Sequence, residues 1–523
     1  MKQIVKKLLF GLIVILALLP TMIQAQQRTV IHVERARIQR YDIQAGKDIE
    51  KLIGNVILRQ DSTWFYCDSA YLNDKTRNFD AFGKVHIKVS DTLNIFSDML
   101  KYNGETRVAE LFDNVKMIDD STILETNYLI YNRFTRLAKY PDNGIITSGQ
   151  NILKSKRGYY RTDLKEFYFA KDVELINPDY TTYTDTMVYN TVSEISYFFG
   201  PTIIRGKENT IYCEYGWYDT GRDHAHLSQK TSMRTNEQLI ESDKLFYDRN
   251  IGFGDAAGNV VITDTTNKMI IKGEVGKIWE DEGRSYVTDQ AYVISYDKTD
   301  SLFMHADTLF LFFNADRKAE RMLAYYGVRF YRKSLQGKCD SLAYHMADST
   351  MRLYKDPVLW SDENQLTADS MYVVTRNDQL DSLVMHNSAF IVSRDTIKGF
   401  NQIKGKNMVG YFEDNELDRI FVDGNAQTIY WVREEDKNLI GINLAKSSTM
   451  LIKLEESEIK GITYYSGPSE VMYPEEELPP GESKLRGFQW LDKLRPLDKM
   501  DIFKRPVLDE STKTDEELPS KKK

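Results

Sequence analysis

One pattern recurs along this chain at nearly constant spacing, and it limits what the chain can fold into. Three copies are GNVILRQDSTWFYCDSAY (54–71), GKVHIKVSDTLNIFSDMLKY (83–102) and DNVKMIDDSTILETNYLIY (113–131). The aliphatic residue of the motif returns at positions 56, 85, 115, 145, 173 and 203, in steps of 29, 30, 30, 28 and 30 residues. Such self-similarity indicates a repeat architecture, in which each unit buries its apolar face against its neighbours.

The residues around this marker alternate between apolar and polar, as in Val85-His86-Ile87-Lys88. A period of two is typical of a half-buried strand. The stretches between markers are rich in Tyr, Phe, Thr and Ile, which favour strands, and Asn, Asp and Gly stand at turn positions. No convincing helical pattern occurs between Gln27 and Trp431. The sequence therefore predicts an all-β fold of stacked antiparallel strands, with two or three short strands in each unit of about 30 residues.

Alternation also predicts which side chains point inward. These candidates either line an open groove or close on one another as a dry core, and the sequence does not separate the two. The inward candidates are Val56, Leu58, Val85, Ile87, Val115, Met117, Val173, Leu175, Val260, Ile262, Val328 and Phe330.

Charge argues against one class of partner. The chain has 523 residues, a net charge of −8 and a pI near 5.6, with acidic and basic residues interleaved. Nucleic acids require a basic face, and the sequence offers none.

The first residues follow the order of a secretory signal peptide. Lysines precede an apolar run from Leu8 to Leu19, and the small residue Ala25 follows. A membrane-spanning helix needs roughly twenty apolar residues, more than this run supplies. We therefore predict a signal peptide over residues 1–25, cleaved after Ala25, and an exported protein. A retained N-terminal anchor is the alternative.

The C-terminal part, residues 441–523, differs in composition. Seven of the twelve prolines lie from Pro468 onward, among many charged residues. Leu485, Phe488, Leu491 and Leu494 recur every three residues, which predicts a short docking helix near residues 484–496. It either caps the repeats of its own chain or binds a partner.

Three cysteines, Cys67, Cys213 and Cys339, occupy one column of the repeat. At roughly 4.8 Å per strand they lie about 20 Å or more apart, whereas a disulfide needs Cα atoms within about 7 Å. We expect three unpaired, partly buried thiols.

No constellation of catalytic residues emerges. His224 and His226 on one strand suggest a zinc site without a third ligand, and the recurring acids suggest a calcium ladder without glycine-rich turns. More simply, each acid bonds the local backbone at a corner between strands. The sequence therefore predicts neither an enzyme nor a bound metal or cofactor.

The repeats resemble the OstA/LptA-like proteins of Gram-negative bacteria, most clearly at GNVILRQDSTWFYCDSAYLND and GKVHIKVSDTLNIFSDMLKYNG. The resemblance covers residues 28–431. We divide it into clear copies over residues 26–205 and divergent copies over residues 206–440. It implies an elongated β-jelly-roll slab in the periplasm, open along one side, that holds the acyl chains of lipopolysaccharide in an apolar groove. This chain is much longer than the bridging members of that family, and no run of barrel strands follows Trp431.

The resemblance implies a periplasmic scaffold for lipopolysaccharide transport in outer-membrane biogenesis, with association with the outer membrane as an alternative location. The implied partners are lipid A, other transport components joined by strand-edge pairing, and further copies of the chain joined head to tail. Two other readings remain open. One is an exported polysaccharide-processing enzyme on a β-helix, and the other is a structural envelope protein.

Overall fold

The computed structural model describes residues 30–41, 48–207, 209–236, 238–296, 300–316, 318–376, 379–414, 416–434, 437–455 and 458–505. The predicted signal peptide and its cleavage after Ala25 lie outside these residues. The chain forms two compact units, of which the first ends at Ser196 and the second begins at Tyr197. In both, the pairings between strands are antiparallel, and the predicted all-β fold is confirmed.

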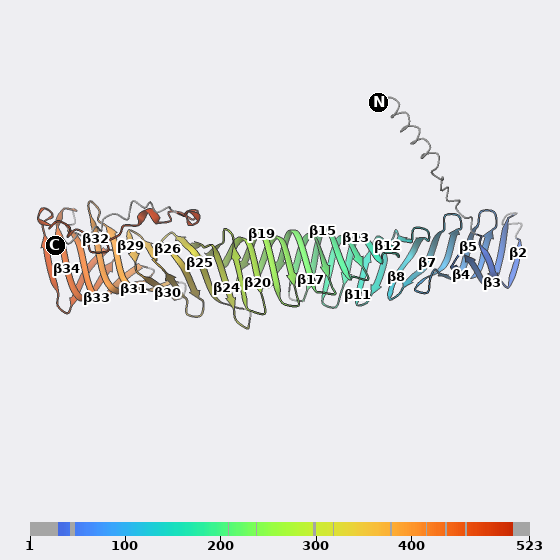
Figure 1. The fold of residues 1–523 in the computed structure, drawn as a ribbon, viewed down its shortest axis with the longest axis horizontal. Helices are drawn as coiled ribbons and strands as arrows, with labels where there is room; N and C mark the ends of the chain where they lie inside the picture. The colour runs from blue at the N-terminus through green and yellow to red at the C-terminus, as the bar shows by residue number, and fades with distance from the viewer. Residues whose placement is uncertain are drawn as a thin grey trace, which may run out of the picture. The chain divides into compact units, whose positions relative to one another are not determined.

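In the first unit the strands follow one another along the ladder in chain order (Figure 1). Strand β15 (Ile195–Gly206) contains the boundary between the units. The strands before it are β1 (His32–Arg35), β2 (Ile38–Tyr41), β3 (Ile49–Gln60), β4 (Thr63–Asn73), β5 (Asn78–Lys88), β6 (Leu93–Asn103), β7 (Val108–Asp119), β8 (Thr122–Asn132), β9 (Leu137–Tyr140), β10 (Gly144–Ser148), β11 (Asn151–Ser155), β12 (Arg157–Arg161), β13 (Glu166–Ile176) and β14 (Tyr180–Asn190).

The long strands of this unit bend at a β-bulge near their middle. In β5 the pairing with β6 skips from Phe82 to Val85, and the bulge residues Gly83 and Lys84 have φ of 73° and 46°. Gly tolerates this left-handed backbone without cost, which explains the glycine before the aliphatic marker. One sequence repeat is therefore two long bent strands, where we expected two or three short ones.

The recurring acid of each repeat lies at this bend. The Asp98 carboxylate accepts a hydrogen bond from Asn114 Nδ2 at 2.7 Å, and Asp243 accepts one from Asn259 Nδ2 at 2.9 Å. These two acids thus bond a bulge side chain, where we expected local backbone, whereas Glu274 accepts from the backbone amide of Asn259 at 3.3 Å. Within the described ranges, no group of three or more His, Cys, Asp or Glu side chains could hold a metal ion.

The second unit is also built as a ladder of antiparallel strands. The strands run past residue 440, and the segment without strands begins at Pro474. The strands are β16 (Thr210–Asp219), β17 (His224–Arg234), β18 (Gln238–Asp248), β19 (Phe253–Asp264), β20 (Met269–Trp279), β21 (Arg284–Thr288), β22 (Tyr292–Tyr296), β23 (Ser301–His305), β24 (Thr308–Phe313), β25 (Ala319–Arg332), β26 (Leu335–His345), β27 (Thr350–Tyr354), β28 (Val358–Ser361), β29 (Asn364–Thr367), β30 (Ser370–Arg376), β31 (Gln379–Arg394), β32 (Phe400–Glu413), β33 (Glu416–Arg433), β34 (Leu439–Glu455), β35 (Glu458–Tyr465) and β36 (Ser469–Tyr473).

Residues 474–505, which we call the strap, run back along the strands of the second unit (Figure 1). The strap holds three short 3-10 turns, η1 (Glu475–Glu477), η2 (Asp492–Leu494) and η3 (Asp501–Phe503), and the helix predicted near residues 484–496 is absent. None of the helices among the described residues has the length and hydropathy needed to cross a bilayer.

Glutamine side chains of the strands hold the strap backbone in place of helical hydrogen bonds. Gln402 donates to the Ser483 carbonyl at 2.9 Å and accepts from the Leu485 amide at 2.8 Å. Gln365 likewise donates to the Gln489 carbonyl at 2.8 Å and accepts from the Leu491 amide at 2.6 Å. The prediction failed because a three-residue apolar spacing also suits an extended chain whose side chains dock one by one.

The strap buries the outer face of the strands below it. Leu494 packs with Val358 and Trp360, whereas Leu359 between them points to the main core of the unit. Both faces of β28 are therefore buried, which accounts for the unbroken apolar run from Val358 to Trp360. A second group joins Leu478 and Leu485 of the strap to Ile429, Trp431 and Ile442.

The far end of the strap rests on a buried histidine. The Phe503 ring lies 5.0 Å from the His305 ring, and His305 Nδ1 lies 2.7 Å from the Ala291 carbonyl oxygen. Burial lowers the pKa of His305 below its usual 6.5, as do Arg505 and Arg329 nearby, against the Ala291 hydrogen bond and Asp307. Because the folded-state pKa is depressed, the stability contributed by neutral His305 is fully present above about pH 6.5 and is lost as the pH falls toward the folded pKa.

We therefore expect the end of the strap to loosen in mild acid. Hydrogen exchange of residues 501–505, corrected for intrinsic rates, should be several-fold faster relative to the strands at about pH 5 than at about pH 7.5. A His305→Gln variant removes the titrating group and should flatten this dependence. If hydrogen exchange in the His305→Gln variant depended on pH as it does in the parent, His305 would not be the group that loosens the strap.

Candidate functional site

The twelve inward candidates all belong to strands, and the structure buries nearly all of them. Eleven are at most 2% exposed, and only Ile262 is half-buried. The eleven are Val56, Leu58, Val85, Ile87, Val115, Met117, Val173, Leu175, Val260, Val328 and Phe330.

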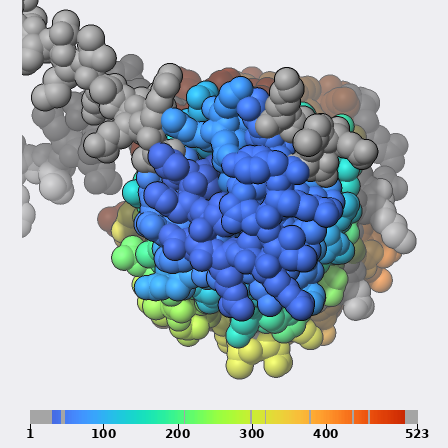
Figure 2. Space-filling view, turned by 90° about the vertical axis from the view of Figure 1, so that its right-hand side faces the viewer, coloured from blue at the N-terminus to red at the C-terminus, as the bar shows by residue number. Residues whose placement is uncertain are grey.

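The interior of the first unit is filled by its own aromatic side chains. The Phe65 ring lies 5.2 Å from Phe79 and 4.7 Å from Tyr102, and the Tyr160 ring lies 4.0 Å from Phe167. All five are at most 2% exposed. The blue N-terminal residues also cover the end of this unit that faces the viewer in Figure 2. The inward candidates of the first unit therefore belong to a packed core in this structure.

The second unit contains an apolar cavity of about 60 Å³. Ile262, the one inward candidate that is half-buried, lines it together with Val260. Several other aliphatic and sulfur-containing side chains contribute to its wall. They include Ile240, Ile271, Ile278, Leu309, Leu311 and Met322.

The repeat explains why the cavity lies here. In β5 and β6, Phe79 faces Tyr102 and Ala81 faces Leu100. At the equivalent positions of β19 and β20, counted from the bulge, Gly254 faces Ile278 and Ala256 faces Gly276. Two large side chains of the first unit are thus replaced by glycines, which leaves space between the strands. The signal was present in the sequence, but it emerges only when the repeats are aligned position by position.

The first unit has a different hollow, which we call the polar pocket, with a volume of about 950 Å³. Its walls come from two rows of turns. One row joins β3 to β4, β5 to β6 and β7 to β8, and the other joins β6 to β7, β8 to β9 and β12 to β13. Side-chain hydrogen bonds cross from one row to the other. The pocket thus lies along the side of the unit where the turns meet.

Local hydrogen bonds shape the second row of turns. Asn132 Oδ1 accepts from the amides of Phe134 and Thr135, and Asn103 does the same for the preceding turn. Such Asx turns explain the Asn at each strand end. Consecutive turns then join along the row, since the Arg133 amide donates to the Arg107 carbonyl at 3.0 Å.

This row presents a column of basic side chains, at Arg77, Arg107, Arg136 and Lys165. Each has a left-handed backbone, with φ between 54° and 59°. Their spacing of 29 or 30 residues places one cation in each repeat, and the last three line the polar pocket. Our reading of the sequence missed this column, although the same spacing could have revealed it.

Gln60 ties the two rows together at one end of the pocket. Its Nε2 donates to the Gly104 carbonyl at 3.0 Å, and the Tyr102 hydroxyl donates to its Oε1. Arg133 Nη1 donates to Gln60 Oε1 at 3.1 Å and to the Tyr102 hydroxyl at 2.7 Å. Burial raises the pKa of Tyr102 against the opposing effect of Arg133.

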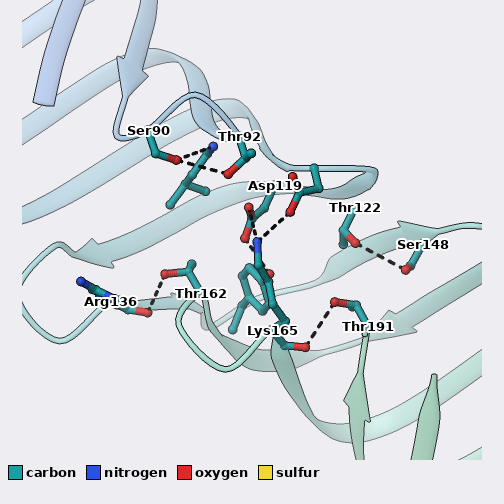
Figure 3. Close-up of polar contacts among 12 residues, drawn as sticks. Ser90, Thr92, Asp119, Thr122, Arg136, Ser148, Thr162, Lys165 and Thr191 are labelled. Carbon is teal, nitrogen blue, oxygen red and sulfur yellow. Dashed lines mark hydrogen bonds and ion pairs between the residues drawn. The ribbon is translucent and has the colours of Figure 1, made fainter. Parts of the chain in front are cut away.

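Asp119 ties the rows together at the other end (Figure 3). Its carboxylate accepts from Lys165 Nζ at 2.6 Å and from the Tyr160 hydroxyl at 2.7 Å, and Lys165 also donates to Asp120 at 3.0 Å. Burial lowers the pKa of Lys165, but the two carboxylates outweigh it and the net shift is upward. Tyr102 and Tyr160 occupy equivalent positions of their repeats, 58 residues apart, and Tyr131, midway between them, lines the pocket.

Comparison with known proteins agrees with this architecture. Residues 28–185 match the family model of OstA-like proteins. These residues form an OstA-like region. No curated protein matches the chain.

A solved structure also resembles part of the chain. It is LptH of Pseudomonas aeruginosa, described as the LptA homologous periplasmic component of the conserved lipopolysaccharide transport device. The identity is 14%, the match covers 21% of this chain and 75% of LptH, and the TM-score is 0.19. A likeness this weak carries no argument about function.

The cysteines and the histidine pair stand apart from both hollows. Cys67 of the OstA-like region, Cys213 and Cys339 are free, which confirms the expectation of unpaired thiols, and all three are buried, where we expected partial burial. Burial raises the pKa of each thiol to about 12, so none is a ready nucleophile at neutral pH. His224 Nε2 lies 3.0 Å from an Asp248 carboxylate oxygen, and the His226 ring stacks on Trp217.

Proposed function

We propose that this chain is a periplasmic scaffold of lipopolysaccharide transport that takes up acyl chain in the apolar cavity of the second unit. The observation that carries the proposal is this cavity, which lies in a β ladder where two glycines replace large core residues. The OstA-like region and the predicted signal peptide support the periplasmic setting. The scaffold needs no catalytic residue, because its task is to keep hydrocarbon out of water.

The hydrophobic effect drives the uptake of the acyl chain into the cavity. Each CH₂ group withdrawn from water contributes about 0.8 kcal/mol, so even a short length of acyl chain is worth several kcal/mol. A cavity of about 60 Å³ holds only a few water-sized groups. Sheltering a whole lipid A therefore requires the walls to move apart. Met233 and Met322 line the cavity, and unbranched thioether side chains repack readily.

The proposal also includes strand-edge pairing with other components of the transport system. In the first unit β1 and β2 pair with β3, and Ile38 and Tyr41 are exposed by 50% and 64%. At the other end of the chain, β35 and β36 pair with β34. Exposed strand edges accept an added strand from a partner or from a second copy.

The test is photo-crosslinking of the mature protein to labelled lipopolysaccharide. A crosslinking residue at Ile262 should give an adduct, because this side chain faces the cavity. The same residue at Ile87, which is 0% exposed in the packed core of the first unit, is the matched control and should give at least tenfold less. Equal yields at the two positions, or no adduct at Ile262, would reject uptake by this cavity.

A further inference from the structure

We propose that the polar pocket of the first unit binds a phosphate group carried by the headgroup of an amphiphile. This inference rests on the proposed function for its lipid source, but its evidence is separate. The pocket lies in the first unit, it is lined mainly by polar and charged side chains, and its volume of about 950 Å³ admits a headgroup.

Arg133 supplies a nearly buried cation to the wall of the pocket. Its side chain is only 8% exposed, and its nearest carboxylate is Asp61 at 3.9 Å. Asp61 is shared with Arg107, which lies closer at 3.2 Å. Two guanidinium groups thus share one carboxylate, which leaves this end of the pocket with an excess of positive charge.

The hydrogen bonds of Arg133 leave its Nε donor unused. Nη1 and Nη2 donate to the neutral groups Gln60 and Tyr102, whereas the buried Nε has no hydrogen-bond partner among the described residues. A buried donor without a partner costs about 1 to 3 kcal/mol, so an acceptor that reaches it is favoured. A guanidinium presents its donors as a planar fork, which matches two oxygens of a phosphate.

The surrounding charges favour this end of the pocket over the other. Arg136 lines the pocket from the same turn as Arg133, between β8 and β9, and is exposed. The opposite end carries Asp119, Asp120 and Asp163, with Lys165 bound to the first two. Glu105 also belongs to the lining, in the same turn as Arg107, and opposes anion binding at the arginine end. The phosphate therefore belongs beside Arg107, Arg133 and Arg136, where cations outnumber the carboxylates Asp61 and Glu105.

Calorimetric titration of the full mature chain tests the inference with three probes. They are inorganic phosphate, dihexanoyl phosphatidic acid below its micellar concentration, and dihexanoylglycerol, which lacks the phosphate. We expect phosphatidic acid to bind at least tenfold more tightly than dihexanoylglycerol. Inorganic phosphate competing at the same site would support a phosphate site, and its strength relative to phosphatidic acid separates a free anion from a lipid headgroup.

Two variants and a control test where in the pocket the phosphate binds. Arg133→Met should weaken phosphatidic acid binding more than tenfold, and Arg136→Met, at an exposed side chain that cannot disturb the core, should weaken it about threefold. Arg157→Met, an exposed arginine on β12 outside the pocket lining, is the control and should bind as the parent does. Equal binding of phosphatidic acid and dihexanoylglycerol, or no loss in Arg136→Met, would overturn the inference. If the adduct at Ile262 still forms in that case, the proposed acyl uptake survives without it.

Discussion

Gly276→Leu is expected to weaken the binding of a fluorescent fatty acid at least tenfold, or about 1.4 kcal/mol. The substitution restores the residue type that the first unit has at the equivalent position, where Leu100 is 0% exposed. A Cβ atom built on Gly276 lies 3.2 Å from Val260 Cγ1 and 3.8 Å from the nearest backbone oxygen, that of Tyr286. The new side chain therefore enters the cavity without striking the backbone, and it occupies the space that the acyl chain needs.

The control for this experiment is the same change at a harmless glycine. Gly461 lies exposed on β35, and a Cβ atom built there meets nothing within 4 Å. Gly461→Leu should bind the fatty acid as the parent does. Thermal unfolding of Gly276→Leu should stay within about 2 kcal/mol of the parent, since filling a cavity stabilises and overpacking destabilises by similar amounts. Undiminished binding by a folded Gly276→Leu protein would show that the acyl chain lies elsewhere.

The repeat made much of the fold predictable. Period-two alternation identified inward positions, and eleven of the twelve residues chosen in this way are at most 2% exposed. A glycine stands before several of the aliphatic markers, and the structure shows that one of them, Gly83, lies in a bulge with left-handed φ. Such features are local, because the backbone conformation and facing of a residue depend on its immediate neighbours.

The features that the sequence did not reveal depend on residues far apart in the chain. Gln60 and Arg133 meet across 73 positions, and Gln365 bonds Leu491 across 126. Neither pair belongs to a local sequence pattern, because the two residues of each pair come together only when the strands have stacked into the ladder. Likewise the apolar spacing of the strap predicted a helix. It is instead a set of separate docking points, whose positions depend on the strands beneath them.

Removing the strap is expected to have the largest effect on stability. A chain ending at Tyr473 exposes Val358, Trp360 and Trp431, which are now at most 6% exposed, and leaves Gln365 without its strap partners. Each large apolar side chain returned to water costs about 1.5 to 3 kcal/mol, so we expect a loss on the order of 5 kcal/mol in the second unit. Calorimetry should show a transition lowered by roughly 10 °C or more, with stronger binding of a hydrophobic dye.

Three further experiments separate the contribution of the strap's apolar contacts from that of the glutamine hydrogen bonds. A chain ending at Arg505 keeps every strap contact described here and should unfold as the full chain does. A synthetic peptide of residues 474–505 added to the truncated chain should restore most of the lost stability, because the strap docks through its own side chains and backbone. Gln365→Ala with Gln402→Ala removes the backbone clamps and leaves the apolar contacts, and should cost about 2 to 4 kcal/mol. If the chain ending at Tyr473 melted at the temperature of the full chain, the strap would be a passive tail, and the buried outer face beneath it would need another explanation.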